Sequence, residues 1–310
     1  MGSDAVSKIT RLGLGTVQFG IDYGVSNQEG QTPPDEIARI LELSSHAGIR
    51  VLDTAMAYGD SEQVLGLSLP REHDFKIVTK TEPIGHARIT RRDAFVLTTT
   101  FQRSLQHLKS DRIYGLLVHQ ADDLLADGGE LLFEAMEKLR SQQLVEKIGV
   151  SVYTGEQIDL ILDRYPINIV QLPINIFDQH LLSGGYIQKL KEAGVEIHAR
   201  SVFLQGLLLM NPASLPPYFE TVKDHLAKFH NTVLASGQSV LGAALDFVLG
   251  LAQIDSAIVG VCSRDHLAEI ISSVESGEIA EIDYSQFALD DENITNPANW
   301  KVDQYEGETC

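Results

Sequence analysis

Cysteine is scarce in this sequence, which has only two in 310 residues, Cys262 and Cys310. Two cysteines cannot build a disulfide framework, so the small disulfide-stabilised folds of secreted proteins are excluded. Long apolar runs are also absent. No stretch approaches the roughly 18 residues of a membrane-spanning helix, and no signal-like segment begins the chain. We therefore expect a protein of the reducing cytoplasm.

Positively charged residues are also few compared with negatively charged ones. Lysine and arginine number 24 against 43 aspartates and glutamates, which gives a net charge of −19. A surface of that sign excludes binding to nucleic acid or to an anionic membrane through a general basic patch. It still allows local basic residues to hold the phosphates of a small cofactor.

Metal-binding patterns are missing as well. The sequence has no His-x-x-x-His or Cys-x-x-Cys motif and no cluster of carboxylates at the predicted strand ends. Imidazole, thiolate and carboxylate groups are the usual ligands of divalent metals in proteins. We therefore predict no metal site.

Apolar, strand-like runs alternate with amphipathic helical ones along almost the whole chain, which is 44% hydrophobic. The predicted strands are 11–16, 49–55, 76–81, 113–120, 145–152, 168–174, 195–202 and 256–261. The predicted helices are 34–47, 61–68, 90–108, 129–143, 155–164, 183–193, 220–249 (broken near Gly237) and 264–275. Eight strands, each followed by a helix, predict a (β/α)8 TIM barrel that forms a single domain over residues 1–310. An open doubly wound sheet is the alternative.

The last part of the chain, 282–310, has a different composition. It is polar and acidic, and Trp300 is the only large apolar residue that we expect to anchor it. We predict a C-terminal tail appended to the barrel.

Three predicted strands end in ionisable side chains, Asp53, Lys80 and His119, and Tyr58 follows Asp53 closely. Active sites of barrels lie at the carboxyl ends of strands, and the alternation along each strand turns all three side chains toward the axis. A tyrosine, with an unperturbed pKa of about 10, is a poor acid, but a lysine ammonium beside it favours the phenolate. A carboxylate can keep that lysine charged, and a histidine can hydrogen-bond the oxygen that receives the proton.

Taken singly, these residues have ordinary explanations: an ion pair, a loop aromatic and a structural histidine. Three charged groups at successive strand ends would be costly inside a barrel unless they compensate one another. Together they predict a site that reduces a carbonyl.

With their neighbours, these residues resemble the aldo-keto reductase family. The matching segments, in the family's order, are Leu12-Gly13-Leu14-Gly15-Thr16-Val17-Gln18-Phe19-Gly20, Asp53-Thr54-Ala55-Met56-Ala57-Tyr58-Gly59, Val78-Thr79-Lys80, Val118-His119 and Ile148-Gly149-Val150-Ser151, with later matches up to about Val274. The resemblance implies an NAD(P)-dependent oxidoreductase that interconverts a carbonyl and an alcohol. Tyr58 would be the acid in reduction and the base in oxidation, Lys80 and Asp53 would lower its pKa, and His119 would orient the carbonyl.

The resemblance also implies a set of cofactor-binding residues. They are Thr16, Ser151 and Gln171 at the nicotinamide, Arg200 beside them, Ser201 and Gly206 at the pyrophosphate, Ser263, Arg264 and His266 at a 2′-phosphate, and Glu269 at the adenine. This set favours NADP, with NAD as the alternative. Arg200 stands where the family commonly stacks an aromatic on the nicotinamide, and a planar guanidinium can also stack. The other interpretation of Arg200 is an ion pair that closes the barrel.

Two further functions would use the same residues. An aldose or alcohol dehydrogenase would work in the oxidative direction, and a cofactor-binding regulatory subunit would use the barrel as an interaction module. The complete set of four residues favours catalysis over the regulatory role. The expected substrate is a small carbonyl compound or sugar, and the sequence carries no signal for an oligomeric state.

Overall fold

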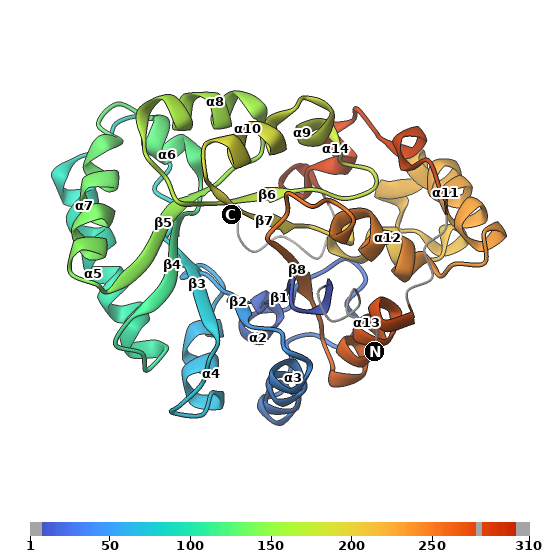
Figure 1. Cartoon of the computed structure of the whole chain (residues 1–310), viewed down its shortest axis with the longest axis horizontal. Helices are drawn as coiled ribbons and strands as arrows, with labels where there is room; N and C mark the ends of the chain where they lie inside the picture. The colour runs from blue at the N-terminus through green and yellow to red at the C-terminus, as the bar shows by residue number, and fades with distance from the viewer. Residues whose placement is uncertain (1–7, 277–280, 302–310) are drawn as a thin grey trace.

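The computed structural model describes residues 8–276 and 281–301. Within them, eight parallel strands pair in chain order, and β1 also pairs with β8, so the sheet closes into a barrel (Figure 1). The strands are β1 (Leu12–Gly15), β2 (Val51–Asp53), β3 (Lys76–Lys80), β4 (Ile113–Val118), β5 (Val145–Ser151), β6 (Ile169–Pro173), β7 (Glu196–Arg200) and β8 (Ser256–Gly260). The (β/α)8 barrel is confirmed, and the open sheet is excluded.

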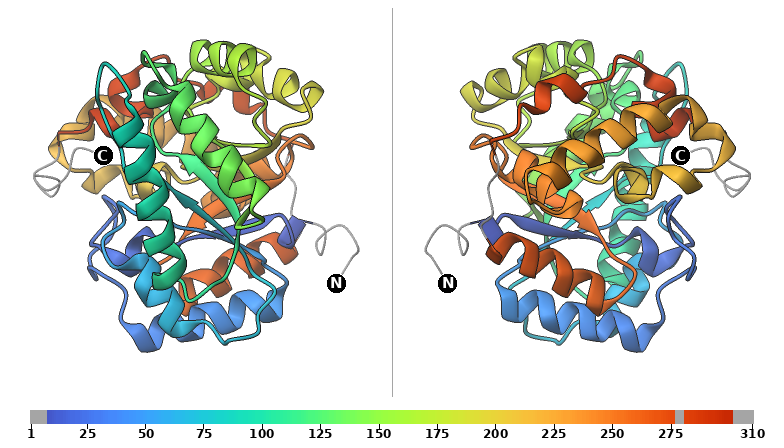
Figure 2. Two further views of the ribbon diagram at one scale, coloured as in Figure 1. Left: turned by 90° about the vertical axis from the view of Figure 1, so that its left-hand side faces the viewer. Right: turned by 90° about the vertical axis from the view of Figure 1, so that its right-hand side faces the viewer.

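Helices cover the outside of the barrel. The longer ones are α3 (Pro34–Ala47), α4 (Ser61–Ser68), α5 (Arg91–His107), α7 (Glu130–Ser141), α8 (Gly155–Arg164), α10 (Tyr186–Glu192), α11 (Lys223–Ala235), α12 (Val240–Leu249) and α13 (Arg264–Ser276). Figure 2 shows α5 and α7 side by side on one flank and α3 beside α13 on another. Their apolar faces pack on the strands, so most of the core lies between the strands and the helices.

Several short elements escape prediction because they are too short for a helical repeat to be visible. They are α2 (Val17–Gly20), α6 (Ala121–Leu125), α9 (His180–Ser183), α14 (Glu292–Thr295), and the 3₁₀ turns η1 (Leu204–Leu209), η2 (Pro212–Ser214), η3 (Pro217–Val222), η4 (Tyr284–Phe287) and η5 (Pro297–Asn299). Three of them, α2, α6 and η1, follow the carboxyl ends of strands. They therefore shape the face on which the candidate site lies.

The predicted break near Gly237 is confirmed. Gly237 has a φ of +82°, a left-handed conformation that a glycine adopts readily, and it lies between α11 and α12. The two segments Pro217–Ala235 and Val240–Leu249 bend by 91° at this break. Within the described ranges, no single helix is long and apolar enough to span a membrane. The two bent segments have the required length and apolarity only when they are counted together.

The barrel interior holds a small apolar layer below the ionisable groups. Its members are Val78, Leu117 and Ile169, with Val51 and Tyr114 packed against them. Asp53 comes two residues after Val51 on β2, so both side chains point to the same side of the sheet. The same spacing relates Lys80 to Val78 and His119 to Leu117. The alternation read from the sequence thus carries the three ionisable groups to the barrel axis.

The opposite end of the barrel contains a polar network around Glu196, the first residue of β7. Its carboxylate accepts hydrogen bonds from the Tyr114 hydroxyl at 2.6 Å and from His198 Nε2 at 2.7 Å, and it also pairs with Lys147. Burial disfavours the charged carboxylate, but hydrogen bonds from His198, Lys147 and Tyr114 outweigh this effect and lower the pKa of Glu196 from its usual 4.5 to about 2. The network therefore stabilises the folded state.

Glu196→Gln is expected to lower the free energy of unfolding at pH 7 by about 2 kcal/mol, because hydrogen bonds to a charged group are each worth about 1.5–3 kcal/mol. The folded-state pKa is depressed, so this stabilisation is complete above the unfolded pKa and is lost as pH falls from about 5 toward 2. Urea unfolding of both proteins at several pH values measures it. A difference that stays constant from pH 7 to pH 3 would contradict the assignment.

The C-terminal segment is anchored differently from the prediction. Phe287 is fully buried and Ile294 nearly so, and Trp300 packs edge-on against Phe219 with ring centroids 4.8 Å apart. The expectation that Trp300 is the only large apolar anchor was therefore wrong, because single apolar residues in a polar segment can still reach the core. Residues 302–310 of the predicted tail lie outside the described part of the chain.

Candidate active site

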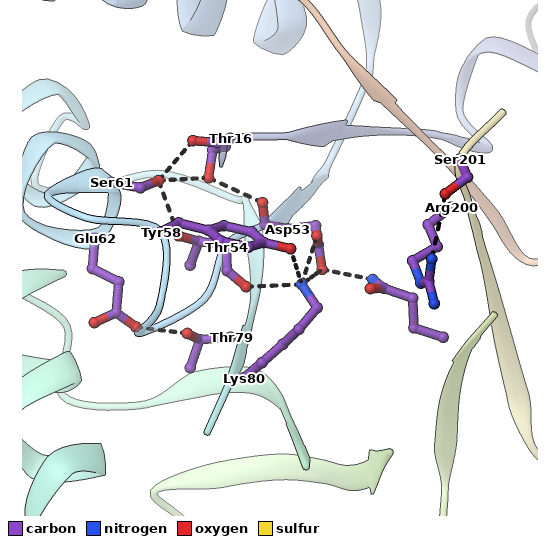
Figure 3. Close-up of polar contacts among 11 residues, drawn as sticks. Thr16, Asp53, Thr54, Tyr58, Ser61, Glu62, Thr79, Lys80, Arg200 and Ser201 are labelled. Atoms are coloured by element: carbon purple, nitrogen blue, oxygen red, sulfur yellow. Dashed lines mark hydrogen bonds and ion pairs between the residues drawn. The ribbon is translucent and has the colours of Figure 1, made fainter. Parts of the chain in front are cut away.

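Lys80, the last residue of β3, is almost completely buried and surrounded by acceptors (Figure 3). Its Nζ donates to both carboxylate oxygens of Asp53 at 2.8 Å and to the carbonyl of Thr54 at 3.0 Å. Burial lowers the pKa of Lys80, and the carboxylate of Asp53 opposes this change. The two residues therefore form a buried ion pair at adjacent strand ends, as the sequence predicts.

Tyr58 lies on the loop between β2 and α4, and its side chain reaches back over this ion pair (Figure 3). Lys80 Nζ donates to the Tyr58 hydroxyl oxygen at 3.4 Å and lies 4.9 Å from the centre of its ring. A cation at this distance favours the phenolate over the phenol. The arrangement suits a group that gives and takes a proton.

His119 follows β4 directly and lies against Tyr58, with the two rings edge to face and their centroids 5.9 Å apart. Burial, helped by the nearby charges of Lys80 and Arg200, lowers the pKa of His119 from 6.5 to about 3. The imidazole is therefore neutral at neutral pH and can donate one N–H to an uncharged carbonyl oxygen. Its Nδ1 is buried without a hydrogen-bond partner among the described residues.

Gln171 on β6 makes a hydrogen bond to the ion pair of Asp53 and Lys80 from another strand of the barrel. Its Nε2 donates to Asp53 Oδ1 at 2.7 Å, whereas its Oε1 is buried and accepts no hydrogen bond from the described residues. Ser151 is paired with it across the β5–β6 ladder. The two side chains place an unused acceptor and a hydroxyl beside Asp53.

A cavity of about 1110 Å³ opens at the carboxyl ends of the strands. Most of the residues named from the sequence line it: Thr16, Asp53, Tyr58, His119, Ser151, Gln171, Arg200, Ser201, Gly206, His266 and Glu269. Lys80 is not part of this lining, but it contacts two lining residues, Asp53 and Tyr58. Ser263 and Arg264 are outside the lining.

Arg200, the last residue of β7, does not make the ion pair considered above. Its guanidinium carbon lies 4.2 Å from the ring centre of Tyr153, and its nitrogens donate weakly to Ser201 Oγ at 3.3 Å and to the Val152 carbonyl at 3.4 Å. No carboxylate pairs with it within residues 8–276 and 281–301. Tyr153, which the sequence reasoning missed, thus makes a cation–π contact with Arg200 in the cavity wall.

The loop after β7 is held in an unusual conformation. Ser201, Leu204, Gln205 and Gly206 all have φ values between 50° and 92°. A Cβ on Gly206 would lie 1.9 Å from Ser26 Oγ, so this position has no space for a side chain. Gln205 also donates to the Tyr23 hydroxyl at 2.9 Å. The loops after β1 and β7 therefore meet at the edge of the cavity.

The polar groups at the start of α13 make hydrogen bonds and an ion pair with other groups of the protein. Ser263 Oγ accepts from the His266 backbone N–H at 3.2 Å, and Glu36 accepts from the Arg264 backbone N–H at 2.6 Å. The half-exposed guanidinium of Arg264 lies 3.5 Å from Asp265. Only His266 and Glu269 of this predicted group face the cavity.

Known proteins resemble this chain in sequence and in fold. A profile of the Aldo/keto reductase family matches residues 11–288. The aldo-keto reductase YhdN of Bacillus subtilis is 27% identical over 191 residues, which cover 58% of this chain but only 54% of that protein. The L-galactose dehydrogenase of Arabidopsis thaliana is 24% identical over an alignment of 310 positions, which covers 93% of this chain and 89% of that protein.

The fold also recurs among solved structures. An aldo-keto reductase from Klebsiella pneumoniae, solved in complex with NADPH, aligns over 93% of this chain and 91% of its own length with a TM-score of 0.65. Its sequence identity of 19% makes this a likeness of fold.

Proposed function

This chain belongs to the aldo/keto reductase family, whose members are oxidoreductases of carbonyl compounds, and we propose that it interconverts a small carbonyl and an alcohol with Tyr58 as acid and base. The observation that carries the proposal is the position of Lys80 Nζ, which lies 2.8 Å from the Asp53 carboxylate and 3.4 Å from the Tyr58 hydroxyl. In reduction, Tyr58 gives its proton to the carbonyl oxygen while Lys80 stabilises the phenolate left behind. In oxidation, the same phenolate takes the proton back.

His119 has a separate part in the proposal. Because its imidazole is neutral at neutral pH, it donates a hydrogen bond to the carbonyl oxygen without adding a second positive charge beside Lys80. It thereby orients the carbonyl toward Tyr58. We infer that the buried Asp53 only holds Lys80 in place and does not transfer protons.

A nicotinamide dinucleotide would supply the hydride, and the residues of the cavity fit such a molecule. The unpartnered Gln171 Oε1 can accept a hydrogen bond from a carboxamide N–H, and Ser151 lies next to it. Arg200 lies over the ring of Tyr153, and both residues line the cavity. The cavity is also lined by Thr16, Ser201 and Gly206, and by His266 and Glu269 of α13.

We propose NADP as the preferred form, supported by the basic residues at the start of α13 and by the NADPH complex of the Klebsiella relative. The contact between Arg264 and Asp265 is an exposed ion pair, and such pairs are worth only about 0–1 kcal/mol. A doubly charged phosphate can therefore compete with Asp265 for the guanidinium.

Arg264→Ala is expected to weaken NADP binding by roughly tenfold to a hundredfold and NAD binding much less, since a charge-assisted hydrogen bond contributes about 1.5–3 kcal/mol. Fluorescence titration of wild type and variant with both cofactors measures the ratio. Arg71→Ala removes another exposed arginine, one outside the cavity lining, and should leave the ratio unchanged. Equal weakening of both cofactors would point to a structural role for Arg264.

The activity itself is tested by nicotinamide absorbance with a panel of aldehydes, ketones and sugars, using both cofactors and both directions. Turnover of at least one carbonyl substrate, absent in Tyr58→Phe, is the expected result. Tight cofactor binding without turnover of any compound would favour the regulatory role instead. No binding and no turnover would overturn the proposal.

The oxidative direction is a second candidate, because the relative that covers 93% of this chain is an L-galactose dehydrogenase. The chemistry of Tyr58 is reversible, so the two directions share one site. Rates with sugars and oxidised cofactor, compared with rates for aldehydes and reduced cofactor, distinguish them.

A further inference from the structure

Three buried hydroxyl groups meet beneath the loop that carries Tyr58 (Figure 3). Ser61 Oγ lies 2.9 Å from Thr16 Oγ1 and 3.0 Å from Thr54 Oγ1, and it donates to the Thr16 carbonyl at 2.8 Å. All three side chains have no solvent exposure. We call Thr16, Thr54 and Ser61 the hydroxyl cluster.

Each hydroxyl has one proton to donate, so three protons serve the four contacts of the cluster, and the contact between Thr16 Oγ1 and Ser61 Oγ can take its proton from either side. Thr16 donates to the Asp53 carbonyl at 3.0 Å, and Ser61 donates to the Thr16 carbonyl. Ser61 Oγ is then available as the acceptor for Thr54. Every proton of the hydroxyl cluster has an acceptor, so removing one hydroxyl removes a hydrogen bond between the segments that the cluster joins.

The hydroxyl cluster joins both ends of the Tyr58 loop. Thr54 directly follows β2, and Ser61 is the first residue of α4, so their hydrogen bond closes the loop across its base. Thr54 also offers its carbonyl to Lys80 Nζ at 3.0 Å. The same cluster therefore contacts the backbone that holds the lysine and the segment that holds the tyrosine.

The short helix α2, which follows β1, also packs against this loop. A Cβ on Gly20 would lie only 1.8 Å from the Tyr58 carbonyl oxygen, so α2 packs directly on the Tyr58 backbone. Tyr58 O in turn accepts from the Ser61 backbone N–H at 3.0 Å. The backbone at Tyr58 is thus held by a hydrogen bond from Ser61 and by close packing against Gly20.

We propose that the hydroxyl cluster is a positioning device that sets the distance between the Tyr58 hydroxyl and Lys80 Nζ. The proposal rests on the function proposed above. At 3.4 Å this contact is already at the long end of the hydrogen-bond range, so a small backbone shift is enough to lose it. Misplacement of a catalytic group by about 1 Å can cost on the order of 10²-fold in rate.

The test uses a matched pair of variants at Thr54. Thr54→Val keeps the shape of the side chain but removes the hydroxyl, whereas Thr54→Ser keeps the hydroxyl and removes the methyl group. Thr54→Val is expected to lower kcat by about tenfold to a hundredfold with little change in KM or in cofactor affinity. Thr54→Ser should recover most of that loss. Equal losses in both variants, or an unchanged kcat in Thr54→Val, would overturn the proposal.

Ser61→Ala is an independent variant of the central hydroxyl and should lower kcat in the same way. Its control is Ser44→Ala on α3, which removes a buried hydroxyl that donates only to the Ile40 carbonyl. Ser44→Ala should lower the melting temperature without lowering kcat at 25 °C. A loss of kcat that follows melting temperature in both variants would mean that the hydroxyl cluster is merely structural.

A double variant separates this proposal from the proposed function. If the hydroxyl cluster acts through Tyr58, adding Thr54→Val to Tyr58→Phe should not reduce the residual rate further. Wild-type activity in Tyr58→Phe alone would defeat the proposed function. An inactive Tyr58→Phe together with a fully active Thr54→Val would defeat only the positioning role.

Discussion

Tyr58→Phe is expected to lower kcat by at least 10²- to 10⁴-fold, the range that general acid–base catalysis usually contributes. The substitution removes one hydroxyl from a half-buried ring and leaves the ring contact with His119 in place. Cofactor affinity and melting temperature should therefore stay close to those of the wild type. Steady-state rates in both directions, with fluorescence titration of the cofactor, measure the effect.

A phenylalanine variant that retains wild-type turnover would rule out Tyr58 as the proton donor. The comparison needs a control for loss of a tyrosine hydroxyl as such. Tyr218→Phe serves this purpose, because Tyr218 donates to backbone carbonyls of the C-terminal segment and does not line the cavity. It should keep full activity.

Lys80→Met is expected to have an effect of similar size, but for an electrostatic reason. The ammonium that favours the phenolate is gone, so the acidic limb of the pH profile for oxidation should move to higher pH, or activity should disappear. The variant also leaves the Asp53 carboxylate buried with only Gln171 as a hydrogen-bond donor. Removing one partner of a buried pair typically costs about 3–5 kcal/mol of stability.

The double variant Asp53→Asn with Lys80→Met separates these two effects. It removes the uncompensated charge and should restore much of the lost stability, as measured by urea unfolding, while the rate stays low. Recovery of activity in the double variant would show that Lys80 is needed only for folding. A single variant with a normal rate and an unchanged pH profile would argue against any electrostatic role.

The periodicity of the sequence predicted the fold and the direction of the side chains along the strands. Strand and helix alternation predicted the barrel, and the spacing of Asp53 from Val51 and of Lys80 from Val78 predicted which side chains face its axis. The ion pair joins adjacent strands: Asp53 lies opposite Val78, and the long side chain of Lys80, two residues further along β3, reaches it. The proposed role of Tyr58 comes from the residues around it, which resemble a known family motif, and it stays a prediction.

Contacts between loops could not be predicted in this way, because they depend on three-dimensional packing that leaves no period in the sequence. The stacking of Arg200 on Tyr153 joins the ends of β7 and β5. The bond between Ser61 and Thr16 joins residues 45 positions apart. Serine and threonine are common in loops for ordinary reasons. The residue types alone therefore do not indicate that the hydroxyls of Ser61 and Thr16 contact each other.

The close contact between Gly20 and the Tyr58 carbonyl also limits how this chain can be changed by directed evolution. Any residue larger than glycine at position 20 would displace the loop that carries Tyr58, the proposed proton donor. Tyr23 and Asn27 follow on the same connection and belong to the lining of the cavity. A combinatorial library aimed at new substrates should therefore randomise these two positions and keep Gly20 constant, so that diversity enters the pocket without moving the catalytic group.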